Sequence, residues 1–153
     1  LTAIRDPNDM VVLHILDSAV LSPLIKYKGN NIADVGTGAG FPGLVLAILN
    51  PEIQFTLIDS IAKKLSFVRT AMVSLNLKNV HIINDRCENI EIENKFDCIV
   101  SRAFAPLCKS KRFTSFSVLP VSTISSTSKT LTSFNDFFKS KLILISPIDS
   151  APQ

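Results

Sequence analysis

The chain has 153 residues, of which 46% are hydrophobic, so it can bury one core but is too short for two ordinary domains. Its net charge of +3 permits an RNA partner without predicting one. The apolar stretches are shorter than the roughly 20 residues that span a bilayer, and the three cysteines lack a CxxC pair, which indicates reduced thiols. We therefore expect one cytoplasmic domain, a monomer, that binds neither membrane nor metal.

The N-terminal segment predicts a helix. Asp6 precedes a proline, a common start of a helix, and an apolar run follows, so we expect a helix over Pro7–Leu21. Within it, His14, Asp17 and Ser18 are spaced so that they share one polar stripe. This stripe faces a ligand in one interpretation; a solvated face or a local histidine–carboxylate pair are the alternatives.

Strands and helices alternate over the middle of the chain. Buried strands are predicted from four apolar runs, Ile32–Val35, Ile53–Ile58, Val80–Ile83 and Phe96–Val100. One helix begins at Phe41 after the first strand, and another, capped by Ser60, follows the second. The second helix is expected to bury Leu65, Phe67, Val68, Met72 and Leu75. The alternation predicts an α/β, Rossmann-like fold, with a parallel sheet and helices on both faces.

Beyond Leu107 this pattern ends. Residues 109–133 are crowded with serine and threonine and have neither a helical nor an alternating period. A further strand is predicted over Lys141–Ser146. We therefore divide the chain into an α/β domain over residues 1–107 and an atypical, irregular or degenerate tail over residues 108–153.

The turn after the first strand carries Gly36, Gly38 and Gly40, which let a ligand approach the backbone closely. In dinucleotide dehydrogenases the third glycine would fall at Phe41. A glycine at Gly40 instead is typical of loops that bind S-adenosylmethionine, although a plain tight turn is an alternative. Asp59, about 20 residues later at the end of the second strand, is placed to bind the ribose hydroxyls of either kind of cofactor.

Several strings of the sequence resemble the bacterial glucose-inhibited division protein B family. In order, these strings are LTAIRDPNDM, HILDS, IADVGTGAGFPG, TLIDSIAKKLSFVR, RCENI and FDCIVSRAFAPL, and the likeness runs from Leu1 to Leu107. The members are 16S ribosomal RNA guanine-N7 methyltransferases of the small subunit (methyltransferase G). The resemblance implies a class I S-adenosylmethionine-dependent methyltransferase whose partner is 16S ribosomal RNA or the small ribosomal subunit.

The resemblance also implies site residues. Gly36 and Phe41 would contact the cofactor, Cys87 and Glu88 would embrace its adenine, and Arg102 would lie at the same site. Simple packing is the alternative for Phe41 and Cys87, a solvated charge for Glu88, and an ion pair for Arg102. Guanine N7 carries no proton, so no catalytic base is expected. Arg102 and Phe104 are candidate neighbours of an extruded base, although core packing is the favoured interpretation for Phe104.

Family members usually begin with further helices and continue after SRAFAPL with a helix, a strand ending in a lysine–glycine pair and a strand hairpin. We therefore expect a truncated start and a frameshifted or degenerate end over residues 108–153. Three hypotheses follow: an active ribosomal RNA methyltransferase, an inactive truncated remnant of one, and a nicotinamide-dependent oxidoreductase. The position of Phe41 disfavours the third.

Overall fold

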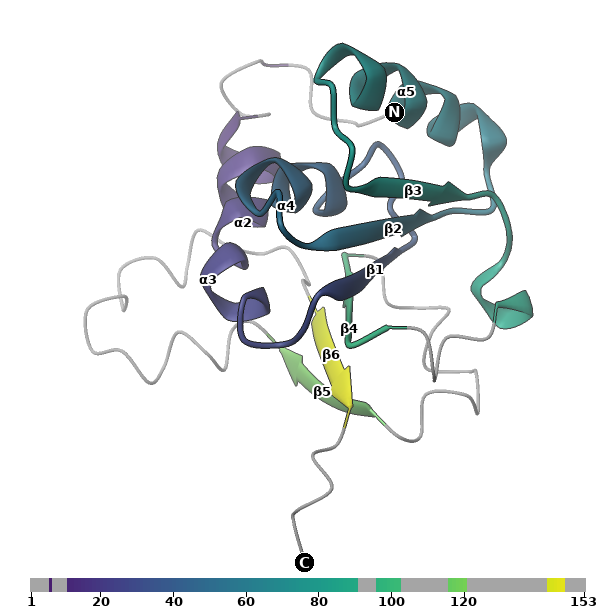
Figure 1. Cartoon of the computed structure of the whole chain (residues 1–153). Helices are drawn as coiled ribbons and strands as arrows, with labels where there is room; N and C mark the ends of the chain where they lie inside the picture. The colour runs from purple at the N-terminus through teal and green to yellow at the C-terminus, as the bar shows by residue number, and fades with distance from the viewer. Residues whose placement is uncertain (1–5, 7–10, 91–95, 103–115, 121–142, 148–153) are drawn as a thin grey trace, which may run out of the picture.

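A computed structural model of the chain describes residue 6 and residues 11–90, 96–102, 116–120 and 143–147 (Figure 1). The helical elements are the π-helical η1 (Val11–Leu16), α2 (Asp17–Ala19), α3 (Ser22–Ile25), α4 (Gly43–Leu49), α5 (Ala62–Ser74) and the 3-10 turn η2 (Cys87–Asn89). The strands are β1 (Asn31–Val35), β2 (Gln54–Ile58), β3 (Val80–Ile83), β4 (Cys98–Ser101), β5 (Phe116–Pro120) and β6 (Ile143–Pro147). Among these described helices, none combines the length and the apolar character needed to cross a lipid bilayer.

The described strands form one sheet in the order β3-β2-β1-β4-β6-β5. β1 pairs in parallel with β2 and with β4, and β2 pairs in parallel with β3. β6 runs antiparallel to both β4 and β5. Successive strands are added on one side of β1 and then, from β4 on, on the other side, and ligands bind at such a switch point, outside the carboxyl ends of the strands. The topology therefore directs attention to the loops that follow β1 and β4.

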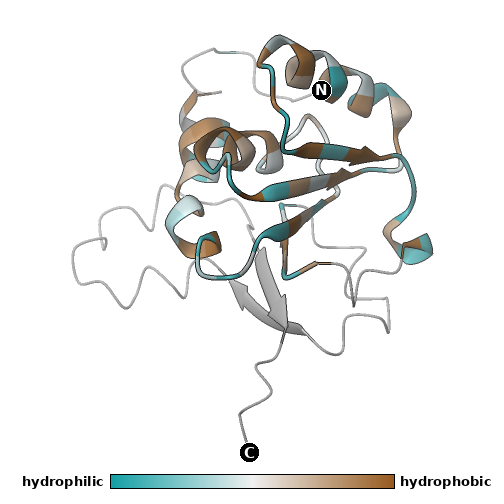
Figure 2. Cartoon of the chain, in the orientation of Figure 1, coloured by the Kyte–Doolittle hydropathy of each residue, from teal (hydrophilic) through white to brown (hydrophobic). Residues whose placement is uncertain are grey.

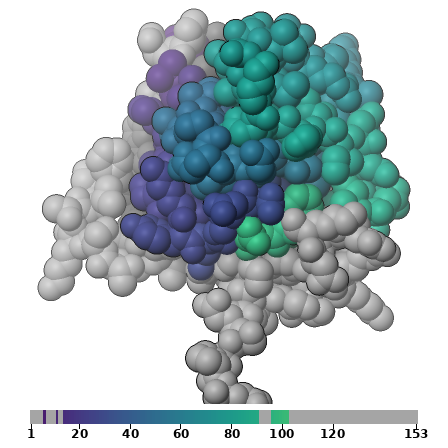
Figure 3. Space-filling view, viewed as in Figure 1, coloured from purple at the N-terminus to yellow at the C-terminus, as the bar shows by residue number. Residues whose placement is uncertain are grey.

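The larger core lies between one face of the sheet and helices α3, α4 and α5. Its fully buried large side chains include Leu21, Ile25, Ile32, Leu46, Phe55, Leu57 and Leu65. Figure 2 shows α4 mainly in the apolar colour, whereas the strands carry both apolar and polar bands. In Figure 3 the segment from η1 to α4, purple to blue, lies along one side of the molecule. On the opposite face, the described residues form a smaller cluster with Cys87 of η2 packed against it. The predicted α/β fold is confirmed, with the parallel sheet formed by β1 to β4.

The N-terminal helix differs from its prediction. Residues 7–10 lie outside the described part of the chain, and the following segment is the π-helical η1 with α2, rather than one α-helix. The helical path also continues beyond Leu21 as α3. The break before α3 has a local cause, because Pro23 lies in the first turn of α3 and has no backbone N–H to donate to the preceding turn.

Two details of α5 were predicted wrongly. Ser60 does not cap this helix: its N-cap residue is Ile61, without a side-chain cap. Phe67 is 45% exposed and Leu75 is 53% exposed, although both were predicted to be buried. For Phe67 the reason is geometric, since Leu65, Val68 and Met72 recur every three or four residues and define the buried face, which Phe67 does not share. Leu75 continues this spacing, but it is the C-cap residue, beyond the last helical residue Ser74.

The C-terminal segment contributes two antiparallel strands. β6 lies close to the predicted strand Lys141–Ser146, whereas β5 lies within residues 109–133, where the sequence showed no period. Five residues give too few repeats for an alternating pattern to be recognised among neighbouring serines and threonines. Pairing with β6, which is distant in sequence, defines this strand.

Asn79 joins the end of α4 to the start of β2. Its buried Nδ2 donates to the carbonyl oxygens of Ala47, Asn50 and Ile53 over 3.0, 3.1 and 3.0 Å. We expect Asn79→Asp to lower the free energy of unfolding by about 3 kcal/mol, because a carboxylate would face three carbonyl oxygens without a proton to donate. Urea unfolding measures this loss. In Asn76→Asp, at an exposed asparagine nearby, the change should stay below about 0.5 kcal/mol, and equal losses in the two variants would contradict the interpretation.

Candidate functional site

The glycine turn lies at the carboxyl end of β1. Gly36 and Gly38 have φ angles of +74° and +60°, which residues with a side chain rarely adopt. A Cβ atom at Gly36 would meet no atom within 4 Å, and at Gly38 the nearest atom would be the Gly36 carbonyl oxygen at 3.9 Å. Both glycines therefore leave open space beside the backbone. Gly40, at φ +93°, instead faces the side chain of Leu44, so the structure gives it a packing role.

Asp59, at the end of β2, is brought together with this turn. Its Oδ2 accepts a hydrogen bond from the Gly38 N–H (2.9 Å), and its Oδ1 accepts one from the Ile61 N–H (2.9 Å). Lys64 Nζ lies 4.0 Å from the same Oδ2. Each carboxylate oxygen has two lone pairs, so Asp59 can hold the turn and still accept hydrogen bonds from a ligand.

Asp34 is a site residue that the sequence analysis missed. It is fully buried in β1, and its Oδ2 accepts hydrogen bonds from Thr37 Oγ1 (2.6 Å) and from the Gly43 N–H (2.8 Å). Among the described residues, its Oδ1 has no hydrogen-bond partner. Burial raises the pKa of Asp34 to about 6, while the charge of Arg102 acts in the opposite direction. The available signal was a carboxyl group inside an otherwise apolar strand, two positions before the first glycine.

Arg102, Phe41 and His14 form a cluster next to the turn. Arg102 Nη2 lies 2.6 Å from His14 Nδ1, and its guanidinium carbon lies 5.8 Å from the centre of the Phe41 ring. The His14 ring stacks on Phe41, with centroids 5.0 Å apart and planes inclined by 22°. Arg102 Nη1 is buried and has no partner within the described ranges. The predicted residues Phe41 and Arg102 are thus in contact, and the sequence did not indicate that His14 would join them.

The polar stripe of the N-terminal helix faces the interior. His14, Asp17 and Ser18 are 8%, 6% and 0% exposed, so the interpretation as a solvated face is wrong. Helical spacing correctly predicted that the three share a face, but spacing cannot tell which side of the helix the rest of the fold covers.

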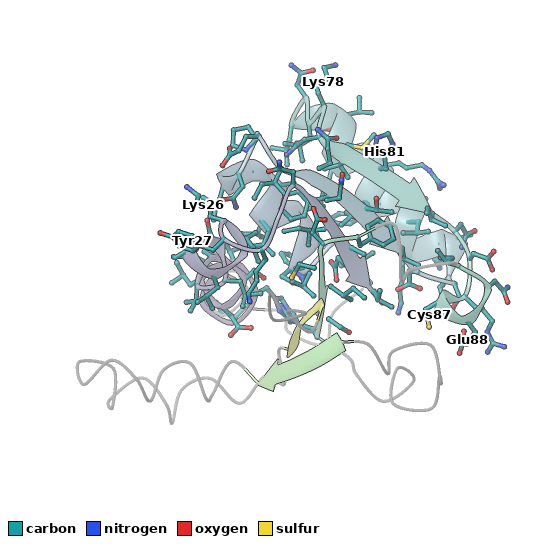
Figure 4. The ribbon with its side chains drawn as sticks, turned by 60° about the horizontal axis from the view of Figure 1, so that its bottom comes forward. Lys26, Tyr27, Lys78, His81, Cys87 and Glu88 are labelled. Atoms are coloured by element: carbon teal, nitrogen blue, oxygen red, sulfur yellow. The ribbon has the colours of Figure 1, made fainter. Side chains whose placement is uncertain are left out.

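Cys87 and Glu88 lie in η2, after β3. Hydrogen bonds from the Asp59 N–H to the Ile83 carbonyl (3.3 Å) and from Asn84 Nδ2 to the Asp59 carbonyl (2.9 Å) join the end of β3 to Asp59. Cys87 is half-buried. Its burial, and to a smaller extent the negative charge of the nearby Glu88, raise the pKa of its thiol. Figure 4 shows both residues on the side of the molecule away from Lys26 and Tyr27. Because β2 and β3 are parallel neighbours, Cys87 and Glu88, which follow β3, lie at the carboxyl-end edge of the sheet, as Asp59 does after β2.

Two further features complete the site. Phe104, a candidate neighbour of an extruded base, lies outside the described residues. In the part of the chain that the structure describes, no group of three or more histidine, cysteine, aspartate or glutamate side chains is arranged to hold a metal ion.

A family model described as GidB, rRNA small subunit methyltransferase G, matches residues 1–124. The ribosomal RNA small subunit methyltransferase G of Psychromonas ingrahamii is 53% identical over 107 residues, which cover 70% of this chain and 51% of the relative. The protein of the same name from Haemophilus influenzae (strain Rd) is 52% identical over 107 residues, which cover 70% of this chain and 52% of that relative. The chain thus spans about half the length of the curated relatives it matches.

Solved structures resemble the fold. A SAM-dependent O-methyltransferase from Thermotoga maritima has a TM-score of 0.56 at 12% identity, over 100% of this chain and 69% of the other. A precorrin-6y C5,15-methyltransferase from Geobacter metallireducens has a TM-score of 0.51 at 12% identity, over 84% of this chain and 86% of the other. At these identities the likeness establishes the fold alone, and it agrees with the predicted Rossmann-like methyltransferase fold.

Proposed function

We propose, because this chain belongs to the GidB family, rRNA small subunit methyltransferase G, that it methylates N7 of a guanine in 16S ribosomal RNA with S-adenosylmethionine as methyl donor. The observation that carries the proposal is the open glycine turn, which a hydrogen bond from Gly38 fixes to Asp59. The partner proposed is the small ribosomal subunit or its RNA, in the cytoplasm. We assign cofactor binding to residues 1–107.

The nucleoside half of the cofactor fits three features of the site. Gly36 and Gly38 leave room for a ligand against the backbone. The carboxylate of Asp59 has lone pairs free to accept hydrogen bonds from ribose hydroxyls. By resemblance, Cys87 and Glu88 would flank the adenine, a position compatible with their place at the end of β3.

The amino-acid tail fits two buried polar atoms. Asp34 Oδ1 is an acceptor and Arg102 Nη1 is a donor, and neither has a partner among the described residues. Buried polar atoms cost stability unless they are paired. A ligand with an ammonium group and a carboxylate group would supply both partners, and S-adenosylmethionine carries both groups.

S-adenosylmethionine supplies a methyl group on a positively charged sulfur. Guanine N7 offers a lone pair and carries no proton, so the reaction requires no general base. The contribution of the chain is therefore to hold the reactants in line and to exclude misaligned poses. Accordingly we assign no catalytic base: His81 is exposed on β3, and His14 is held in the cluster with Arg102 and Phe41.

Calorimetric titration of the 153-residue chain with S-adenosylhomocysteine tests the cofactor site, with NAD as the control ligand. We expect saturable binding of the first compound and none of NAD. Small subunits that lack the modification, incubated with the chain and labelled S-adenosylmethionine, should then gain 7-methylguanine, detected by mass spectrometry of nuclease digests. A folded chain that binds no S-adenosylhomocysteine would overturn the proposal. Binding without methylation would favour the inactive remnant.

Cofactor binding should release a proton near pH 6. Burial raises the pKa of Asp34 to about 6, and a bound ammonium group would favour its carboxylate and lower this pKa. At pH 6 about half a proton should be released per ligand, and at pH 8, where Asp34 is already ionised, almost none. Binding enthalpies measured in buffers of different ionisation enthalpy report this number. Asp34→Asn should abolish the release; a release that persists in this variant would assign it to another group, such as His14.

A further inference from the structure

We propose that His14 is a positioning residue that holds the guanidinium of Arg102, so that its remaining donor Nη1 can bind the carboxylate of the cofactor. This inference rests on the proposed function, since it assigns a role to a side chain behind the proposed tail-binding site. It concerns a residue of η1, which precedes β1, the first strand of the sheet.

The hydrogen bond between the two residues has one possible direction. Arg102 Nη2 lies 2.6 Å from His14 Nδ1, and a guanidinium is always protonated and has no acceptor. His14 Nδ1 must therefore accept, which makes the ring neutral with its proton on Nε2. Because this hydrogen bond holds Nη2 in place and the guanidinium is planar, it also defines the direction in which Nη1 points.

Phe41 fixes the orientation of both partners. The His14 ring stacks on Phe41 at 5.0 Å, and the Arg102 guanidinium carbon lies 5.8 Å from the same ring. The three side chains come from η1, from the loop two residues before α4, and from the residue that follows β4. An arginine held by a hydrogen bond and an aromatic ring has few rotamers left, which lowers the entropic cost of binding an anion.

The free end of Arg102 points to an anionic ligand. Nη1 is buried and unpaired within the described residues. Among the described residues, Asp34 in β1 is one charged group that Arg102 influences, since the charge of Arg102 lowers its pKa. Asp17 lies three residues after His14, in α2. The carboxylate of an amino-acid tail would bind Nη1, while Asp34 would face its ammonium.

Two variants separate the acceptor from the ring. His14→Phe keeps an aromatic ring to stack on Phe41 but removes the acceptor for Arg102. His14→Asn keeps an acceptor near the position of Nδ1 but removes the ring. His81→Phe, at the exposed histidine of β3, is the matched control.

Two probes separate tail binding from nucleoside binding. S-adenosylhomocysteine carries the amino-acid tail, whereas 5′-methylthioadenosine has the same adenosine and thioether without it. We expect His14→Phe to weaken binding of S-adenosylhomocysteine about tenfold or more and to leave binding of methylthioadenosine within about twofold. His14→Asn should recover part of the loss, and His81→Phe should bind both probes like the wild type. A fold defect would affect both probes equally, so the ratio of the two affinities reports positioning.

A double variant completes the test. If His14 acts through Arg102, His14→Phe combined with Arg102→Met should lose no more affinity for S-adenosylhomocysteine than Arg102→Met alone. Additive losses, or equal weakening of both probes by His14→Phe, would overturn the inference. Unchanged S-adenosylhomocysteine affinity in His14→Phe would overturn it while leaving the proposed function in place. If the folded wild type bound neither probe, both proposals would fail.

Discussion

Gly43→Ala is expected to lower the free energy of unfolding by about 3 kcal/mol or more, a large part of the stability of a small domain. Gly43 begins α4, and its N–H donates to Asp34 Oδ2 over 2.8 Å. A Cβ atom there would overlap Leu57 Cδ2 and lie 2.6 Å from Asp34 Oδ2. Leu57 and Asp34 are fully buried, so neither can move aside without disturbing the core. Urea unfolding followed by circular dichroism measures the loss.

Gly36→Ala is the comparison for this prediction. Its Cβ would meet no atom within 4 Å, so the positive φ angle is the main source of strain, and the loss should be only about 1 kcal/mol. Combining Gly43→Ala with Leu57→Val removes the overlapping methyl group, and the double variant should lose less stability than the sum of the two single changes. Equal losses from Gly36→Ala and Gly43→Ala would show that close packing of α4 on the sheet is not the cause.

Asp59→Ala is expected to weaken binding of S-adenosylhomocysteine about 100-fold or more, the result of losing hydrogen bonds to a charged group at the ribose. The variant also leaves the N–H groups of Gly38 and Ile61 without the acceptor that holds the turn. Calorimetric titration measures the affinity. Glu52→Ala, which removes an exposed acid in the loop before β2, should bind like the wild type.

Asp59→Asn distinguishes support of the turn from contact with the ligand. The amide keeps one acceptor oxygen for Gly38 but loses the charge and the second acceptor, so an intermediate affinity is expected. If Asp59→Ala bound S-adenosylhomocysteine within about twofold of the wild type, Asp59 would serve the fold alone.

The central strands and the glycine turn were predictable because their signals are local. An apolar run that ends in glycines predicts a buried strand with a sharp turn, and β1 to β4 lie within two residues of their predicted bounds. The motif of two glycines followed by an acid about 20 residues later predicted that Gly36, Gly38 and Asp59 belong to one site. In the structure Gly38 donates a hydrogen bond to Asp59, and Gly36 lies in the same turn. The strands and the turn depend on backbone conformation and on burial, which residues close by in the sequence determine.

The site residues that were missed depend on contacts between distant segments. Asp34 was not assigned because the role of a carboxyl group in a strand depends on its hydrogen-bond partners. Here the partners are Thr37 and Gly43, which lie in the following turn and helix. The pairing of His14 with Arg102 joins residues 88 positions apart. Phe67 was predicted to be buried because it is apolar, yet its angular position on α5 leaves it exposed.

The sequence by itself determined the α/β class, the order of the central elements, the open turn and the family resemblance, because local periodicity and short motifs carry that information. Only the tertiary structure decided that β5 and β6 add antiparallel strands beside β4 and that Gly40 packs against Leu44. It also decided that His14 of η1 contacts Arg102 and Phe41. Such features arise when chain crossovers bring separate elements together, and no local spacing encodes which side chains then meet.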